Sequence, residues 1–254
     1  MVRTNRKIPG LSRLEPSPLN KSSRNSLPLK THIPGHPVAV LYEDDHYVVF
    51  DRPSGLLVIP TPKNEQRTLV NIVNQQYAHR EKTWKLHPCH RIDKETSGAI
   101  IFAKGKHAQR LMMDLFKERE VTKKYIAFAH GKLSKGCGEF RRPVKKVFQG
   151  KFGKKQAGIQ AITCYKVLKI KKQFSVIEVQ PVTGRTNQIR IHFSQAGHPL
   201  VGDRKYAFAR DYGVKFRRTA LHAASLEWTH PVSQRQVSVQ SNLPKDMEEF
   251  IVKH

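Results

Sequence analysis

Most apolar positions of this chain fall in short runs, and short runs predict β-strands rather than long helices. Residues 38–42 and 47–50 are two such runs separated by four polar residues, a pattern typical of a hairpin. Residues 99–103 are continuously apolar between flanking glycines, as expected of a buried strand. Residues 121–129 alternate like a strand with one buried face, and residues 174–179 form a further run. The pattern predicts a fold with several strands.

Three stretches are predicted to be helices. Residues 106–118 predict an amphipathic helix, because their apolar side chains recur at the spacing of one helical face: Ala108, Leu111, Met112, Leu115 and Phe116. Thr68 is a candidate N-cap for a shorter helix over residues 69–76. A third helix is predicted to start at Thr186 and to end before Gly197.

The first 36 residues differ from the rest in composition. They are rich in Ser, Pro, Asn, Lys and Arg, and Glu15 is their single acid. Such a segment lacks the apolar residues needed for a core, so we predict a disordered basic arm at 1–36 and one folded domain at 37–254. An organelle transit peptide is the alternative, but prolines interrupt any amphipathic helix there. We therefore expect a cytoplasmic protein.

The charge balance points to a polyanionic partner. The 254 residues include 46 Lys and Arg against 20 Asp and Glu, a formal net charge of +26. A balance this strongly basic indicates nucleic acid as the default partner. No stretch approaches the roughly 20 apolar residues that span a bilayer, so we expect no membrane partner.

Cysteine and histidine usage gives no sign of a disulfide framework or a metal site. The three cysteines are unpaired in spacing and are typical of reduced thiols in an intracellular protein. His87, Cys89 and His90 are crowded together without a second ligand pair at the spacing of a zinc finger. We expect neither metal nor cofactor.

The candidate chemistry lies just before the buried strand at 99–103. Asp93 belongs to the sequence His-Arg-Ile-Asp-Lys and is expected on a loop, with Arg91 and Lys94 on either side. Nearby cations favour the ionised carboxylate, which suits a nucleophile or a base. The competing interpretation is an Asp that caps a helix or closes an Asx-turn.

Several ordered motifs carry a resemblance that decides between these interpretations. The stretch HRIDKETSGAIIFAK closely resembles the signature of the RluA family of RNA pseudouridine synthases. Lys124-Tyr125 resembles the second family motif, and residues 184–190 resemble the third, Gly-Arg-Thr-His-Gln-Ile-Arg, with Asn187 in place of the usual His. The resemblance extends over about residues 38–235. The basic arm is too short to be the separate S4 RNA-binding domain that some members carry.

The resemblance implies a fold, a reaction and a set of residues. It implies an α+β catalytic domain with a mixed, mainly antiparallel sheet, and isomerisation of uridine to pseudouridine in RNA without cofactor or metal. By carry-over from the motifs, Asp93 is the catalytic nucleophile, Tyr125 stacks on the target base, and Arg185 pairs with Asp93. Arg91 is expected to occupy the space that the extruded nucleotide leaves.

We expect RNA as the partner of a monomeric enzyme, with ribosomal or transfer RNA favoured over messenger RNA. The residues predicted to contact RNA are Arg91, Lys124, Arg190, Arg141, Arg142 and Lys145, and a second basic cluster lies at residues 204–218. A non-catalytic RNA-binding or ribosome-assembly protein with the same fold stays an alternative. A metal-dependent nuclease is a weaker one, because no suitable cluster of acids is visible. The RNA, the uridine and the point of attack by Asp93 stay open.

Overall fold

The structure is a computed structural model, and it describes residues 37–63, 65–79, 84–133, 136–144, 158–207 and 212–254. The predicted basic arm and Lys145 lie outside these ranges. None of the helices in the described ranges is long and apolar enough to cross a membrane.

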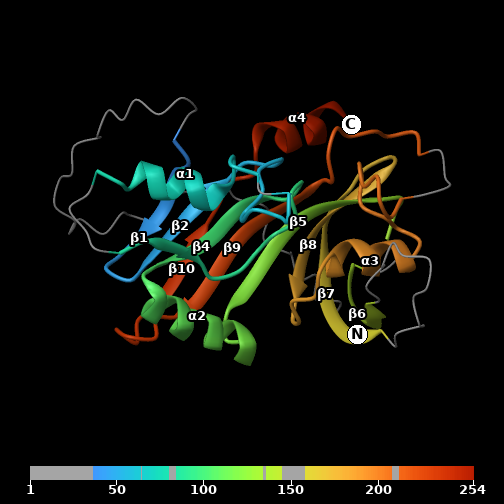
Figure 1. Ribbon diagram of the computed structural model, residues 1–254. Helices are drawn as coiled ribbons and strands as arrows, with labels where there is room; N and C mark the ends of the chain where they lie inside the picture. The colour runs from blue at the N-terminus through green and yellow to red at the C-terminus, as the bar shows by residue number, and fades with distance from the viewer. Residues whose placement is uncertain (1–36, 64, 80–83, 134–135, 145–157, 208–211) are drawn as a thin grey trace, which may run out of the picture. The chain divides into compact units, whose positions relative to one another are not determined.

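Within the described residues the chain forms ten strands of one sheet and four helices (Figure 1). The strands are β1 (Ala39–Glu43), β2 (Tyr47–Arg52), β3 (Leu86–Pro88), β4 (Ser97–Lys104), β5 (Thr122–His130), β6 (Cys137–Val144), β7 (Ile159–Ile170), β8 (Phe174–Pro181), β9 (Leu221–Thr229) and β10 (Gln236–Gln240). The helices are α1 (Leu69–Gln76), α2 (Lys106–Glu118), α3 (Gln188–Gln195) and α4 (Lys245–Lys253).

The elements predicted from periodicity are confirmed. Strands β1 and β2 form the expected antiparallel hairpin, and α2 has the predicted bounds. Thr68 is the N-cap residue of α1, although its side chain makes no capping hydrogen bond. Helix α3 starts one residue later than predicted, because its N-cap is Asn187 rather than Thr186.

The basic stretch that begins at Phe140 is strand in the part that the structure describes, which ends at Val144. Arg141 and Arg142 lie in β6, with exposed side chains, and β6 pairs with β7 along its whole length. Phe140 stacks on Tyr165 of β7 and meets Phe193 of α3 edge-on. Arg141 and Arg142 therefore lie on an outer strand of the sheet rather than on a free loop.

The sheet is mixed but mainly antiparallel, as expected. Its order is β1-β2-β4-β9-β5-β8-β7-β6, with β10 beside β9 and β3 beside β4. Among the described strand pairs, β4 and β9 run parallel and all others antiparallel. At this junction Gly98 lies opposite Ala223, and its positive φ of 109° suits glycine.

Helices pack on the sheet through alternating side chains. Ile100 and Phe102 of β4 pack with Val73 of α1. The residue between them, Ile101, packs in a different cluster with Met112 of α2. This alternation follows from the two-residue period of a strand and buries both faces of β4.

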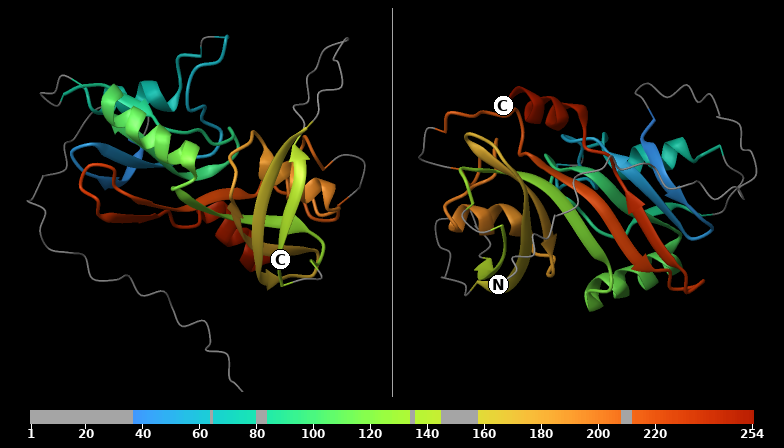
Figure 2. Two further views of the ribbon diagram at one scale, coloured as in Figure 1. Left: turned by 90° about the horizontal axis from the view of Figure 1, so that it is seen from below. Right: turned by 180° about the vertical axis from the view of Figure 1, so that it is seen from behind.

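Helix α3 lies against the β6–β7 hairpin, which is seen beside it in Figure 2. The ring of His192 contacts Thr163 Oγ1 at 2.9 Å and the carbonyl of Arg142 at 3.1 Å. Ile189 and Phe193 belong to the core cluster that also contains the β5 side chains. This packing fixes the N-terminal end of α3 close to β5.

We predict that Gly98→Ala destabilises the domain through the β4–β9 junction. A Cβ at this position would lie 2.3 Å from the carbonyl oxygen of Ala223, and the backbone would be strained. We expect the free energy of unfolding to fall by about 3 kcal/mol. In thermal denaturation the melting temperature should fall by roughly 6–12 °C.

Gly136→Ala is the matched control, because nothing lies within 4 Å of a Cβ there and its φ is not in the left-handed region. A Gly98→Ala protein that melts together with the Gly136→Ala protein would contradict this account of the junction.

Candidate active site

Asp93 begins a four-residue turn that leads into β4. The Thr96 N–H donates to the Asp93 carbonyl at 3.0 Å, which closes the turn. Each of the four carbonyls of residues 93–96 accepts a hydrogen bond from elsewhere in the chain or within the turn. The backbone that carries the Asp93 carboxylate is therefore fixed by its own polar groups.

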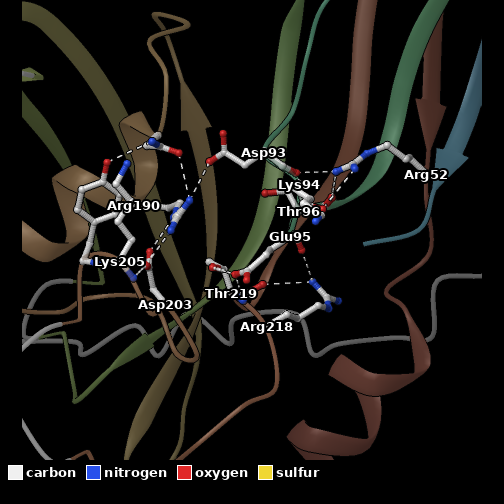
Figure 3. Close-up of polar contacts among 12 residues, drawn as sticks. Arg52, Asp93, Lys94, Glu95, Thr96, Arg190, Asp203, Lys205, Arg218 and Thr219 are labelled. Carbon is white, nitrogen blue, oxygen red and sulfur yellow. Dashed lines mark hydrogen bonds and ion pairs between the residues drawn. The ribbon is translucent and has the colours of Figure 1, made fainter. Parts of the chain in front are cut away.

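Arg52, at the end of β2, supplies three of these bonds (Figure 3). It is fully buried, and its guanidinium donates to the carbonyls of Asp93, at 2.6 Å, Lys94, at 3.3 Å, and Thr96. Burial lowers the pKa of Arg52 to about 10, and the negative charge of Asp93 opposes this shift. Arg52 is still a cation at neutral pH, beneath the turn.

Arg218 holds the other side of the turn. It is buried, pairs with both carboxylate oxygens of Asp246 at 2.8 and 3.0 Å, and donates to the Glu95 carbonyl at 3.2 Å. The Glu95 carboxylate in turn accepts the N–H and the hydroxyl of Thr219 at 3.0 and 2.7 Å. Arg52 and Arg218, which are far apart in the sequence, therefore both hold the backbone of the turn.

The carboxylate of Asp93 pairs with Arg190, which lies on α3. Arg190 Nη1 is 3.4 Å from Asp93 Oδ2, while its Nε and Nη2 donate to the two oxygens of Asp203 at 2.7 and 2.8 Å. Burial lowers the pKa of Arg190, but the ion pairs with Asp203 and Asp93 outweigh it and raise the pKa above its ordinary value. The guanidinium is therefore a permanent cation beside Asp93.

This geometry corrects the predicted partner of Asp93. Arg185 is exposed on the loop before α3, and in the described part of the chain its side chain makes no ion pair with Asp93. Arg190, predicted to contact RNA, is instead buried and faces the carboxylates. Arg190 takes the place predicted for Arg185 because it lies within α3 and its side chain reaches the Asp93 turn. Arg185 lies on the loop before the helix.

Tyr125 lies at the wall of the same site. It is buried on β5, opposite Ala223 of β9 and Val179 of β8. Burial raises the pKa of Tyr125, the negative charge of Asp93 raises it further, and Arg52 opposes the shift. Tyr125 is therefore a neutral phenol across the physiological pH range.

These side chains line one cleft of about 500 Å³, a volume suited to a small ligand or one extruded nucleotide. Its walls come from residues 89–93, the end of α2, the start of β5, and residues 181–190. Among the described residues that line it, Asp93 is the one acid, and the cations are Arg91, Lys117, Arg119, Lys123, Arg185 and Arg190. A lone carboxylate stands in a strongly cationic cleft.

The family model for RNA pseudouridylate synthase matches residues 46–195, which is more than half of the chain. The chain belongs to this family. The match includes Asp93, Tyr125, Arg185 and Arg190. The RluA-type resemblance, the α+β fold and the class of enzyme, an isomerase acting on RNA, are confirmed.

Individual relatives agree with the family assignment. The uncharacterized RNA pseudouridine synthase YhcT of Bacillus subtilis is 32% identical over 214 residues, which cover 82% of this chain and 70% of YhcT. The dual-specificity RNA pseudouridine synthase RluA of Pasteurella multocida is 34% identical over 204 residues, 78% of this chain and 90% of RluA. The solved structure of human RNA pseudouridylate synthase domain containing 4 superimposes with a TM-score of 0.70 at 26% identity, covering 84% of this chain and 92% of that chain.

The remaining residues predicted to contact RNA are spread over two regions of this pseudouridine synthase domain. Arg91 is exposed and lines the cleft. Lys124 is half-buried on β5, with Nζ 3.9 Å from Glu227 Oε1. Arg141 and Arg142 lie on β6 and are not among the residues that line the cleft. Their contact with RNA stays a prediction.

Three residues important for the site were not assigned to it from the sequence. Arg218 belongs to the basic cluster at residues 204–218 that was predicted to face RNA, yet its side chain is buried. Arg52 and Arg218 hold backbone carbonyls, and Asp203 anchors Arg190. Their roles depend on contacts between distant parts of the chain. The nearest available signals were an Arg-Pro pair at the end of a predicted strand and an acid after Gly202 within a basic segment.

A cluster of possible metal ligands lies elsewhere, at Asp44, His46 and His230, whose ligand atoms lie within 4.8 Å of one another. His230 Nδ1 accepts the N–H groups of Val232, at 3.1 Å, and Ser233, at 3.0 Å. A neutral ring therefore carries its proton on Nε2, which faces Asp44 Oδ2 at 3.2 Å. This arrangement fits a structural His–Asp hydrogen bond better than a metal site.

We predict that Arg52→Lys destabilises the enzyme although it keeps the charge. A lysine ammonium cannot reproduce the fork that serves several carbonyls at once, so buried acceptors lose their donor. We expect the free energy of unfolding, measured with urea, to fall by about 3 kcal/mol.

Arg235→Lys, at an exposed position between β9 and β10, is the control and should change stability by no more than about 0.5 kcal/mol. Equal stability of the two variants would show that Arg52 does not hold the turn.

Proposed function

We propose that this pseudouridine synthase isomerises uridine within structured RNA, with Asp93 as the nucleophile. The proposal rests on one observation above all: a single carboxylate is held beside a buried arginine in a cleft whose other charged lining residues are cations. A polyanionic chain is attracted to such a cleft, and the one anion within it is placed where a nucleotide would enter.

The reaction balances without a further reactant. Uridine and pseudouridine are isomers: the bond from the ribose to the ring nitrogen is exchanged for a bond to a ring carbon, and the proton on that carbon is moved. Asp93 attacks the nucleoside and is released again, so the carboxylate is regenerated. Arg190 pairs with this carboxylate at 3.4 Å and holds it at the cleft.

Tyr125 supplies a flat face for the target base. The ring is buried at the wall of the cleft beside Asp93, and its raised pKa keeps the hydroxyl protonated. It can therefore stack on an extruded uracil and donate a hydrogen bond to it while the base is detached. A phenolate base is not expected at neutral pH.

Arg185 and Arg91 are proposed to contact the RNA rather than Asp93. Both side chains are exposed, and both line the cleft that contains Asp93. Exposed guanidinium groups bind phosphates at little cost of desolvation. They would hold the strand on either side of the target nucleotide.

The substrate is proposed to be ribosomal or transfer RNA. Relatives named as ribosomal large subunit pseudouridine synthase D support ribosomal RNA within this class. That the enzyme acts as a monomer in the cytoplasm stays a prediction.

We predict that Asp93→Asn abolishes catalysis and leaves RNA binding intact. The amide keeps the shape of the side chain but is not a nucleophile, so pseudouridine formation in total cellular RNA should fall by at least about 10³-fold. Affinity for the same RNA should stay within about threefold, because phosphate contacts dominate it.

Asp45→Asn, at an exposed acid in the β1–β2 turn, is the control for the loss of one negative charge and should be fully active. An active Asp93→Asn enzyme would refute the role of Asp93. RNA binding without product from the wild type would favour the non-catalytic alternative.

We predict that Arg185→Gln weakens RNA binding more than it slows the reaction. If Arg185 contacts one phosphate, KM should rise about 3–10-fold, the slope of log affinity against log salt should become shallower by about 0.7, and kcat should stay within about twofold. The control is Arg235→Gln. A large loss of kcat at unchanged KM would instead support the pairing of Arg185 with Asp93.

A further inference from the structure

The guanidinium of Arg190 is held by three side chains, which together contact all three of its nitrogens. Asp203 binds Nε and Nη2 in a bidentate pair. The remaining nitrogen, Nη1, donates both to Asp93 Oδ2, at 3.4 Å, and to the side-chain oxygen of Asn187, at 3.1 Å. Asn187 therefore shares the same nitrogen that contacts Asp93.

The orientation of the Asn187 amide is determined by its partners. Arginine can only donate hydrogen bonds, so the amide oxygen must face Arg190. The amide nitrogen then faces the hydroxyl of Tyr206, which accepts its hydrogen bond at 3.1 Å. Tyr206 also lies against the guanidinium, with its ring centre 5.1 Å from the Arg190 carbon.

The Tyr206 side of this arrangement is itself anchored. Asp203 Oδ1 accepts the backbone N–H groups of Lys205, at 2.9 Å, and Tyr206, at 3.0 Å. The carboxylate that clamps Arg190 thus also positions the tyrosine that orients Asn187. Asp203, Tyr206 and Asn187 therefore form one connected set of contacts around Arg190.

The backbone at position 187 restricts which residues fit. Asn187 is the N-cap of α3 and has φ 57° and ψ 19°, in the left-handed region. Asparagine enters this region more readily than most residues, and glycine enters it freely. A glycine variant therefore removes the amide while it keeps the backbone.

We propose that Asn187 is a positioning residue that acts through Arg190 to aim Asp93, and that its amide makes this hold independent of pH. The proposal rests on the function of Asp93 proposed above. The charged and titratable groups that face position 187 or Arg190 are Arg190 itself, Asp93, Asp203, Tyr206 and, over the Tyr206 ring, Lys205.

An imidazole at this position would behave differently. A neutral histidine can accept from Arg190 through one nitrogen and donate to Tyr206 through the other, as the amide does. A protonated histidine has no acceptor left and places a second cation beside Arg190. Asn187, where the motif of the resembled family has His, does not titrate.

The test compares the wild type with Asn187→Gly, Asn187→His and Tyr206→Phe. Pseudouridine formation is measured in total RNA from cells that lack this protein, at saturating and at limiting RNA, from pH 5 to pH 8.5. Thermal denaturation of each variant verifies that it is folded.

For Asn187→Gly we expect kcat to fall about tenfold at every pH, while KM stays within about twofold of the wild-type value. The reason is that the variant loses the orientation of the Asp93 carboxylate and keeps the contacts that bind RNA. Asn187→His should recover most of this loss at pH 8. Its rate should then fall about tenfold relative to the wild type through a transition between pH 5 and pH 7. Tyr206→Phe should lower kcat about threefold.

Three outcomes would overturn the proposal: a wild-type kcat in Asn187→Gly, a loss confined to KM, or superimposable pH profiles of Asn187→His and the wild type. If Asn187→Gly does not fold, the proposal is tested by the pH profile of Asn187→His together with kcat of Tyr206→Phe. A wild-type pH profile and a wild-type kcat would then overturn it. A wild-type enzyme without activity in any RNA refutes the proposed function instead. An active wild type with an inactive Asp93→Asn and a fully active Asn187→Gly refutes the role of Asn187 alone.

Discussion

Buried arginines hold the turn that carries Asp93, and the rest of the site depends on this hold. Arg52 and Arg218 satisfy backbone carbonyls of residues 93–96, and Arg190 takes the carboxylate itself (Figure 3). Burying a cation is costly unless its donors find acceptors, and the carbonyls of the turn accept from Nη1 and Nη2 of Arg52. The arrangement keeps the carboxylate in place before any substrate arrives, which lowers the entropic cost of the reaction.

The arginines of this enzyme are divided between two tasks. Those that serve Asp93 are buried and paired with carbonyls or acids. Those that line the cleft on the outside, Arg91 and Arg185, are exposed and fit contacts with phosphates. In the proposed mechanism, burial rather than residue type separates the arginines that hold Asp93 from those that contact RNA.

How much could be predicted differs between local and long-range features. The β1–β2 hairpin and α2 follow from residue spacing, because their periodicity is local. The family motif identified Asp93, but the choice between Arg185 and Arg190 as its partner depends on where α3 begins and which way it faces. The position of α3 depends on its packing against the β6–β7 hairpin, and the sequence pattern gave little sign of this packing. The role of Arg52 was hidden for the same reason.

The most direct test of the central claim is transcriptome-wide mapping of pseudouridine in cells that lack this protein, each rescued with wild type or with Asp93→Asn. We expect a defined set of sites to disappear in the knockout, to return with the wild type, and to stay absent with Asp93→Asn expressed at the same level. This result would confirm the activity and identify the RNA together. Sites that return equally with both proteins, or no lost sites at all, would contradict the account of Asp93 as the nucleophile.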